Sequence, residues 1–158
     1  IKNLKGVIEI QANNNELDDN LAHPKLYMVS GNDFIANSQF QEEVFGPFSL
    51  IIKCKDLNEM EQVIKNLEGQ LTGSIFAKES DYKQITPLIQ AFKSKVGRLL
   101  FNDVPTGVEV SEAMTHGGPY PASSDSRFSA VGPDSIYRWV RPITYQNWPK
   151  ELIEKLIH

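Results

Sequence analysis

The sequence has one cysteine, three histidines and no apolar run that approaches the roughly 20 residues of a membrane-spanning helix. A single cysteine cannot form an internal disulfide, which is typical of a reducing compartment, so we expect a cytoplasmic protein. His23, His116 and His158 lack the spacing of metal ligands, and no metal site is predicted. Neither a Gly-x-Gly-x-x-Gly pattern nor a Walker loop is present, which excludes the usual phosphate-binding loops.

Positive charge is also scarce, because 16 Lys and Arg residues stand against 20 Asp and Glu residues and give a formal net charge of −4. Nucleic-acid binders normally present a basic face, so we expect small molecules or proteins as partners, and neither nucleic acid nor membrane. The 158 residues, 41% of them hydrophobic, suit one globular domain with a real core. The chain opens at Ile1 without a signal-peptide pattern, and we expect it to be part of a longer polypeptide.

Strand and helix patterns alternate in the middle of the chain. The apolar run at 48–54 predicts a strand covered on both faces. Asp56 is expected to cap a helix over 57–67, and Gly69 to close it. A strand over 71–77, a helix over 81–95 with a possible start at Pro87, and a strand over 96–102 follow. This order predicts an α/β fold with a doubly wound, mostly parallel sheet.

The two ends of the chain are less regular. Near the N-terminus, strands are predicted over 6–11 and 26–29, separated by a polar loop over 12–20, and the second strand is expected to end at a Gly31-Asn32 turn. Toward the C-terminus, the sequence predicts a long loop over 104–134, a strand over 139–145 and a short helix over 150–158.

Pro142 lies inside the predicted strand 139–145, and a proline favours an edge strand, which is able to pair with another chain. We therefore expect two parts: 1–134, which forms the body of the fold, and a tail, 135–158, which contains a C-terminal oligomerisation strand.

Few residues are candidates for chemistry. Glu42-Glu43-Val44-Phe45-Gly46-Pro47 places two carboxylates and an aromatic ring before a strand, although the segment taken alone favours a solvated turn over a functional site. Cys54 shares strand parity with Leu50 and Ile52, which favours a core residue over a nucleophile. Four arginines are interpreted as solvated or paired side chains: Arg98, Arg127, Arg138 and Arg141.

The order of motifs resembles the carboxyl-terminal part of the aldehyde dehydrogenase family, roughly over 24–148. Glu43-Val44-Phe45-Gly46-Pro47 before a strand, the strand 97–102 that ends in Asn102, and the Gly117-Gly118 pair carry this resemblance. Three further segments, 105–110, 116–125 and 141–147, resemble the branch that oxidises 2-oxoglutarate semialdehyde (2,5-dioxovalerate), usually with NADP. Thr115-His116-Gly117-Gly118 stands where general members carry Pro-Phe-Gly-Gly and agrees with that branch.

The resemblance implies a mechanism in which a cysteine thiolate attacks the aldehyde, hydride passes to the nicotinamide of NADP or NAD, and a glutamate activates water to release the acid. Both catalytic residues and the cofactor-binding domain precede the segment that matches Ile1 in the family. No catalytic residue is therefore assigned here, and no cofactor is expected to bind this chain alone. The resemblance implies ribose and nicotinamide contacts for Glu43 and Phe45, and substrate-pocket contacts for Val110 and His116.

Two hypotheses follow. In the first, the chain is a part of an aldehyde dehydrogenase and needs the rest of its own polypeptide to act. The intact enzyme would oxidise a small aldehyde and form a homo-oligomer. The second is a stand-alone α/β interaction module with the strand 139–145 as its pairing element. Another aldehyde dehydrogenase branch is a further alternative to the first.

Overall fold

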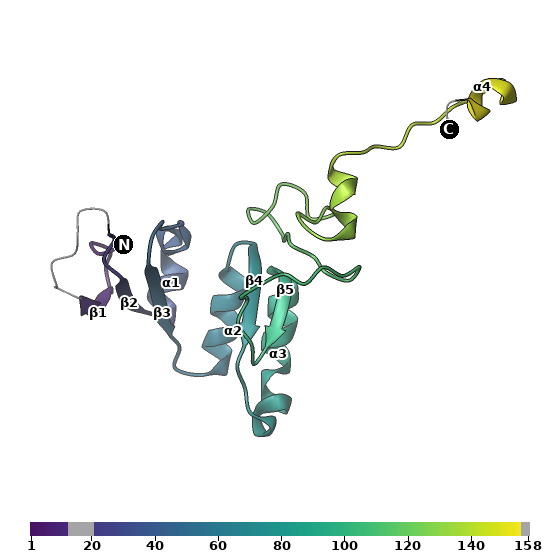
Figure 1. Cartoon of the computed structure of the whole chain (residues 1–158). Coiled ribbons are helices and arrows are strands. Elements are labelled where there is room, and N and C mark those ends of the chain that lie inside the picture. The colour runs from purple at the N-terminus through teal and green to yellow at the C-terminus, as the bar shows by residue number, and fades with distance from the viewer. Residues whose placement is uncertain (13–20, 156–158) are drawn as a thin grey trace.

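The computed structural model describes residues 1–12 and 21–155 and has an α/β fold (Figure 1). The strands are β1 (Ile8–Ala12), β2 (Lys25–Ser30), β3 (Phe48–Lys53), β4 (Gln70–Ile75) and β5 (Val96–Phe101). The α-helices are α1 (Gly31–Ala36), α2 (Leu57–Asn66), α3 (Tyr82–Lys93) and α4 (Lys150–Glu154), and the short 3-10 helices are η1 (Ser38–Gln41), η2 (Glu79–Asp81) and η3 (Pro133–Arg138). No helix in these two ranges is long and apolar enough to span a membrane.

The strands form two separate sheets in the described part of the chain. In the first sheet the order is β1-β2-β3, with β1 antiparallel to β2 and β2 parallel to β3, from Lys25 opposite Phe48 to Ser30 opposite Lys53. In the second sheet β4 is parallel to β5. The predicted α/β class with parallel strands is confirmed. Among the described residues the parallel pairs belong to two sheets, because β3 and β4 do not pair with each other.

Helix α2 joins the two halves through neighbouring apolar residues. Val63 is buried with Val29, Phe34 and Phe40 beside the first sheet. Ile64 is buried with a second cluster beside the other sheet, formed by Ile75, Ile85, Leu88 and Ala91. Complete burial of an aliphatic side chain contributes roughly 1.5–3 kcal/mol to the free energy of unfolding. Val63 and Ile64 together therefore contribute several kcal/mol, and they attach α2 to both sheets.

The predicted cap and helix at Asp56 are confirmed. The Asp56 Oδ1 atom accepts a 2.8 Å hydrogen bond from the Glu59 amide, which satisfies one of the free N–H groups of the first turn of α2. The predicted turn at Gly31-Asn32 is wrong, because Gly31 begins α1. Ser30 caps that helix, and its Oγ atom accepts a 3.1 Å hydrogen bond from the Asp33 amide.

Helix α3 begins before the proline that the sequence suggested as its start. Helix η2 leads directly into Tyr82, and the Asp81 carboxylate accepts a 3.1 Å hydrogen bond from the Lys78 amide. Pro87 therefore lies inside α3 and provides no N–H for the carbonyl of Lys83. Both residues are exposed, so water can reach that carbonyl group and limit the cost of the missing bond.

The burial of β3 differs from the expected strand covered on both faces. Its side chains alternate between half-buried and exposed, and Ile51 is 43% exposed. Leu50 and Ile52 pack against the cluster around Val29, whereas the side chains of the opposite parity are exposed. One face of β3 is thus uncovered in this chain.

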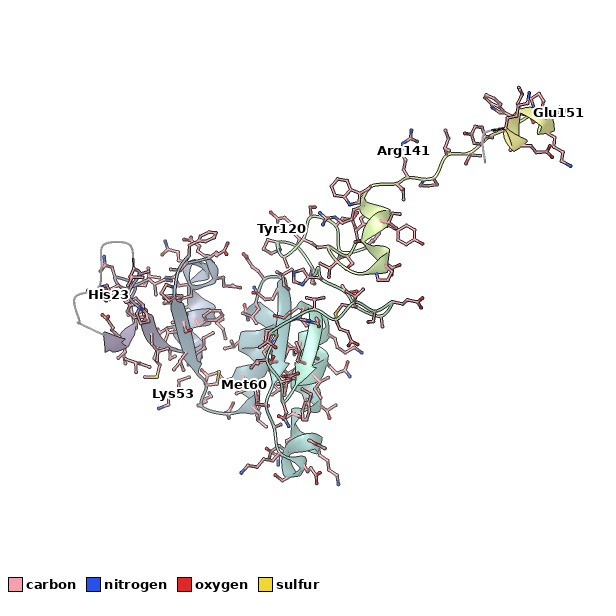
Figure 2. The ribbon with its side chains drawn as sticks, viewed as in Figure 1. His23, Lys53, Met60, Tyr120, Arg141 and Glu151 are labelled. Carbon is pink, nitrogen blue, oxygen red and sulfur yellow. The ribbon has the colours of Figure 1, made fainter. Side chains whose placement is uncertain are left out.

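The C-terminal third is mostly irregular, as expected for 104–134. The chain after β5 runs back along the β4–β5 sheet, where the Arg98 Nη1 atom donates a 2.7 Å hydrogen bond to the Gly107 carbonyl (Figure 1). The predicted strand 139–145 is not a strand here, because a strand needs a partner edge and this segment pairs with no described strand. Figure 2 shows Arg141 and Glu151 on a segment that extends away from the sheets. Helix α4 confirms the predicted terminal helix over 150–154, and 156–158 lie outside the described residues.

Asn102 closes the second sheet with its side chain. It adopts a φ of 50°, which asparagine tolerates better than most residues. Its Nδ2 atom donates to the Ala77 carbonyl over 3.0 Å, and its Oδ1 atom accepts from the Ala77 amide over 2.9 Å. The side chain therefore continues the pairing of β4 and β5 beyond the last ladder residue.

We predict that Asn102→Ala lowers the free energy of unfolding by about 1–3 kcal/mol, since two hydrogen bonds of roughly 0.5–1.5 kcal/mol each are lost. Urea unfolding measures the change. Asn102→Gly is the control for backbone conformation, because glycine accepts a positive φ at no steric cost. A glycine variant as stable as the wild type would show that the side-chain bonds do not contribute.

Candidate functional site

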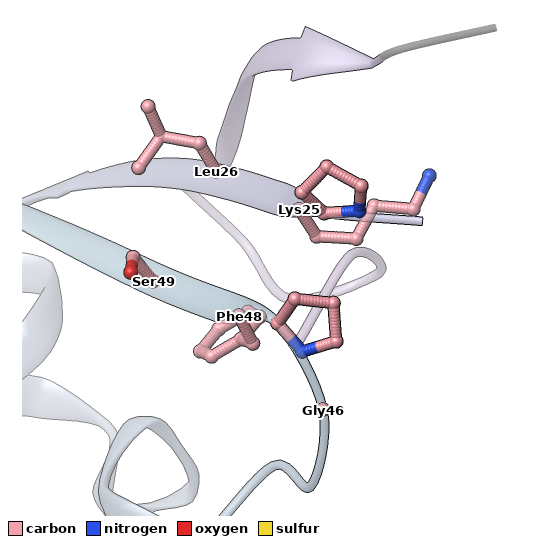
Figure 3. A pocket seen from close by; sticks show the side chains of 7 residues that line it. Lys25, Leu26, Gly46, Phe48 and Ser49 are labelled. Carbon is pink, nitrogen blue, oxygen red and sulfur yellow. The ribbon is translucent and has the colours of Figure 1, made fainter. Parts of the chain in front are cut away.

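The segment Glu42 to Pro47 forms a fixed turn between η1 and β3. Gly46 has a φ of 118°, a conformation that side chains rarely adopt. The Pro47 carbonyl accepts a 2.8 Å hydrogen bond from the Lys25 amide, so the turn is attached to the start of β2. A cavity of about 410 Å³ lies here, and Figure 3 shows Lys25, Phe48 and Ser49 around it. Neither Glu43 nor Phe45 lines this cavity.

Glu43 lines a different cavity, of about 590 Å³, between the end of η1 and the start of β4. Gln41 fixes the distance between these walls: its Nε2 atom donates to the Asn66 carbonyl over 3.1 Å, and its Oε1 atom accepts from the Glu68 amide over 2.7 Å. Gln41 itself lines the cavity, and the other lining residues are Glu42, Glu68, Gly69, Gln70, Leu71, Thr72, Pro121 and Ala122.

The chemistry of this cavity suits hydroxyl groups better than phosphates. Three glutamates, Glu42, Glu43 and Glu68, line it together with no lysine or arginine. Carboxylates accept hydrogen bonds from hydroxyl groups and repel anions. The ribose hydroxyls of a dinucleotide therefore fit the residues present, and its phosphates do not.

His116 lines a third cavity, of about 380 Å³, together with Leu71, Gly117, Ala122, Ser123, Ser124, Asp125, Phe128, Ala130 and Arg138. Its backbone is held on both sides, because the His116 amide donates to the Ser129 Oγ atom over 3.1 Å and the His116 carbonyl accepts from the Ala130 amide over 2.9 Å. Ser123 supports the next turn, since its Oγ atom donates to the Gly118 carbonyl over 2.6 Å. The backbone at His116 is thus held in place beside this cavity.

The cavity of Glu43 and the cavity of His116 are neighbours, because Leu71 and Ala122 line both of them. Glu43 and His116, which are 73 positions apart by their numbers, therefore open into adjoining space at the amino ends of β3 and β4. The structure does not bring Phe45 and Val110 into this space. Phe45 is 89% exposed and Val110 is 81% exposed, and neither lines these two cavities.

Glycines allow the loop around His116 to lie directly on the second sheet. A Cβ atom on Gly69 would lie 1.9 Å from the Pro119 carbonyl oxygen, and one on Gly97 would lie 1.9 Å from the Gly117 carbonyl oxygen. The Gly69 amide donates to the Tyr120 carbonyl over 3.2 Å. The expected role of Gly69 as the stop of α2 is wrong, because the helix ends at Asn66 and Leu67 is its C-cap.

Cys54 has the properties of a structural thiol. It is half-buried against the cluster around Val29. Burial raises the pKa of the Cys54 thiol, and the carboxylates of Glu59 and Asp56 raise it further. A nucleophilic cysteine needs a lowered pKa, so the prediction that Cys54 is not the nucleophile agrees with its surroundings. Across residues 1–12 and 21–155, no three potential ligands from His, Cys, Asp and Glu are grouped to hold a metal ion.

The four arginines have different environments. Arg127 pairs with Asp125 over 2.6 Å, and hydrogen bonds from the Arg127 side chain and backbone lower the pKa of Asp125 to about 2. Asp125 therefore stays ionised at any pH well above that value. Arg98 holds the loop after β5, Arg138 lines the His116 cavity, and Arg141 lies on the extended tail.

Sequence reasoning missed Gln41 and Ser123, because each acts on backbone that is distant in sequence or in a loop of irregular geometry. No local pattern marks such contacts. The sequence did contain one useful signal for the glycines, namely the Gly117-Gly118 pair, although it did not indicate which strands the pair approaches.

Residues 8–133 match the model of a family described as "Aldehyde dehydrogenase family". The chain belongs to the aldehyde dehydrogenase family. It is 44% identical over 150 residues to alpha-ketoglutaric semialdehyde dehydrogenase 2 of Azospirillum brasilense, a match that covers 95% of this chain and 29% of that protein. It is also 44% identical over 137 residues to alpha-ketoglutaric semialdehyde dehydrogenase of Acinetobacter baylyi, over 86% of this chain and 26% of that protein. The predicted family and branch resemblance are confirmed.

Solved structures agree with the fold of this aldehyde dehydrogenase chain. The Delta-pyrroline-5-carboxylate dehydrogenase of Mycobacterium tuberculosis aligns with a TM-score of 0.61 and 20% identity, over 96% of this chain and 28% of that one. A structure of the same protein bound with NAD aligns with a TM-score of 0.60. The chain therefore spans less than a third of the length of the relatives it matches.

We predict that Gly97→Ala releases the loop around His116, because its Cβ atom would overlap the Gly117 carbonyl oxygen. Amide hydrogen exchange over 116–122 should become at least about tenfold faster, as expected when a local opening costs about 1.4 kcal/mol less. Gly107→Ala is the matched control, since a Cβ atom there meets nothing within 4 Å. Equal exchange in the two variants would contradict the proposed packing.

Proposed function

We propose that the chain is part of an enzyme that oxidises an aldehyde to its carboxylate with NADP or NAD, and that the aldehyde is 2-oxoglutarate semialdehyde. The observation that carries the proposal is the 44% identity, over 95% of the chain, to a protein named for that substrate. NADP is the preferred cofactor in this proposal, following the resemblance of the segments 105–110, 116–125 and 141–147. The intact enzyme acts in the cytoplasm.

In this proposal the chain provides positioning groups and not the nucleophile. Cys54 follows the Glu43 motif, whereas the catalytic cysteine precedes it in the family that the sequence resembles. Its raised pKa supports the same conclusion. The cysteine nucleophile and the glutamate base belong to the rest of the enzyme, which is a necessary partner of this chain.

Glu43 binds the ribose next to the nicotinamide. Its support is the anionic cavity between η1 and β4, where a carboxylate can accept hydrogen bonds from both ribose hydroxyls. Phe45 packs beside the same ribose and the nicotinamide ring. The high exposure of Phe45 is compatible with a contact surface that is completed by another part of the enzyme.

His116 and Val110 form the wall of the aldehyde pocket. His116 is held by its backbone in a cavity next to that of Glu43, which puts a substrate wall beside a cofactor wall. Val110 lies on the exposed segment between Arg98 and His116, and its contact with substrate also requires the rest of the enzyme.

Residues 135–158 form the oligomerisation part of this proposal, and 1–134 form part of the catalytic domain. Trp139 is 85% exposed, and Val140, Ile143 and Tyr145 are exposed as well. Exposed apolar groups on an extended segment with unpaired backbone are suited to pairing with a second copy of the chain.

The same tail supports the second candidate function, a stand-alone interaction module without enzymatic activity. The two candidates differ in what lies before Ile1. The codons that precede Ile1 encode a cysteine-containing catalytic segment in the first candidate and none in the second, so reading them separates the two.

We expect no aldehyde oxidation from the isolated chain. A chimera in which this chain replaces the matched segment of the Azospirillum brasilense relative should oxidise 2-oxoglutarate semialdehyde in preference to simple aliphatic aldehydes. Formation of reduced cofactor, followed by absorbance, measures both. Turnover by the isolated chain would refute the division of catalytic residues, and a preference for aliphatic aldehydes would refute the proposed substrate.

In that chimera, Glu43→Gln should slow hydride transfer about tenfold to a hundredfold, because a hydrogen bond to a charged group contributes roughly 1.5–3 kcal/mol. Single-turnover kinetics with pre-bound cofactor measure this step. Glu79→Gln, in η2 near the carboxyl end of β4, is the matched control and should leave the rate unchanged. Unchanged single-turnover kinetics in Glu43→Gln would remove Glu43 from the site.

A further inference from the structure

Arg98 of β5 connects the second sheet to both ends of the loop that carries Val110. Its Nη1 atom donates a 2.7 Å hydrogen bond to the Gly107 carbonyl and a longer, weaker one to the Met114 Sδ atom over 3.9 Å. Residues 108–113 lie between these two contacts in the sequence. One nitrogen atom thus holds the ends of the segment 107–114 together and closes it into a compact loop.

This loop has little other support. Most of the segment 104–113 is exposed. A further hydrogen bond, from the Met114 amide to the Ser111 carbonyl over 3.2 Å, is local to the loop and does not attach it to the sheet. A segment with few buried apolar contacts opens easily, so the position of the loop depends strongly on Arg98.

The backbone of Arg98 lies beside the proposed cofactor wall. Arg98 is opposite Thr72 in the register of β4 and β5, and register partners on adjacent strands project from the same face of a sheet. Thr72 lines the cavity of Glu43. The side chain of Arg98 therefore starts on the face that borders this cavity and ends at the loop that carries Val110.

The neighbouring residue, Gly97, supports the next part of the chain. A Cβ atom there would lie 1.9 Å from the Gly117 carbonyl oxygen, so the loop around His116 lies directly on β5. Two adjacent residues of β5 therefore support the backbone near both candidate substrate contacts, near Val110 through Arg98 and near His116 through Gly97.

Stability alone does not explain a charged residue at this position. Arg98 is half-buried and takes part in none of the ion pairs found in residues 1–12 and 21–155. Its Nε atom is buried without a hydrogen-bond partner. An unpaired buried N–H group lowers stability, and an apolar side chain of similar length avoids this loss. An apolar side chain cannot, however, form the bridge to Gly107 and Met114.

We propose that Arg98 is a positioning residue for the aldehyde pocket, because it holds the loop 107–114 closed and thereby places Val110 against the bound aldehyde. Arg98 acts through the loop, to which its Nη1 atom donates, and the contact with substrate belongs to Val110. This inference rests on the proposed function, in which Val110 is part of the pocket wall.

Steady-state kinetics of the chimera with the Azospirillum brasilense relative test this role. Arg98→Met should raise KM for 2-oxoglutarate semialdehyde about tenfold and leave kcat nearly unchanged, as expected when binding common to ground state and transition state is lost. KM for pentanal should rise as well, because pentanal meets the same wall and has no carboxylate. Arg98→Lys keeps a charged donor and should restore KM at least in part.

Lys93→Met is the matched control, because Lys93 is an exposed residue of α3 and its replacement removes the same charge. It should leave KM for both aldehydes unchanged. Equal KM values in Arg98→Met and Lys93→Met would overturn the proposal. A rise confined to the semialdehyde would also contradict it, because that result indicates direct recognition of the substrate carboxylate and not placement of the wall.

Backbone amide relaxation, measured by NMR on the isolated chain, tests the loop without reference to activity. We expect order parameters of about 0.85 over 107–114 in the wild type, as in rigid backbone, and below about 0.6 in Arg98→Met. The midpoint of thermal unfolding should be the same in both proteins within error. Equal order parameters, or a lower midpoint combined with an unchanged KM, would show that Arg98 is not a positioning residue.

The two experiments separate this inference from the proposed function. A loop that becomes mobile in Arg98→Met, together with a chimera that oxidises neither aldehyde, would support the restraint of the loop by Arg98 and refute the proposed function. A chimera that oxidises the semialdehyde with the same KM before and after Arg98→Met would support the function and overturn the positioning role.

Discussion

The two halves of the structure are held together by helix α2, whose apolar side chains pack into two different hydrophobic cores. Val63 and Ile64 are adjacent in α2, yet Val63 packs beside the first sheet and Ile64 beside the second. Because the sheets share no strand pairing in the described residues, the arrangement of the two halves is set largely by the helices. The position of Glu43 relative to His116 is a result of this packing, since each belongs to a different half.

The site itself depends on contacts between backbone segments. Gly69 and Gly97 let the loop around His116 approach the second sheet to distances that exclude any side chain. Gln41 similarly ties the end of η1 to the loop that precedes β4. The cavities of Glu43 and His116 therefore have walls of fixed backbone, and their chemical character comes from the few side chains that project from those walls.

Local patterns predicted much of this chain. The stripe in 57–67 with its Asp56 cap, and the strands over 26–29, 71–77 and 96–102, depend on interactions between near neighbours, which periodicity reports directly. The resemblance to a known family supplied Glu43 and His116, which no periodicity marks. The separation into two sheets and the exposed face of β3 could not be predicted in this way, because both depend on which strands are present to pair. For the same reason the segment 139–145 has strand-forming residues and no strand.

The extended segment from Val140 to Pro149 sets how far the C-terminal helix can be from the rest of the chain. Ten residues of extended polypeptide span at most about 33–36 Å. That reach is comparable with the diameter of a small domain, so α4 can lie a full domain's width away from the two sheets. Any contact that α4 makes with a second molecule would depend on protein concentration, whereas the packing around α2 does not.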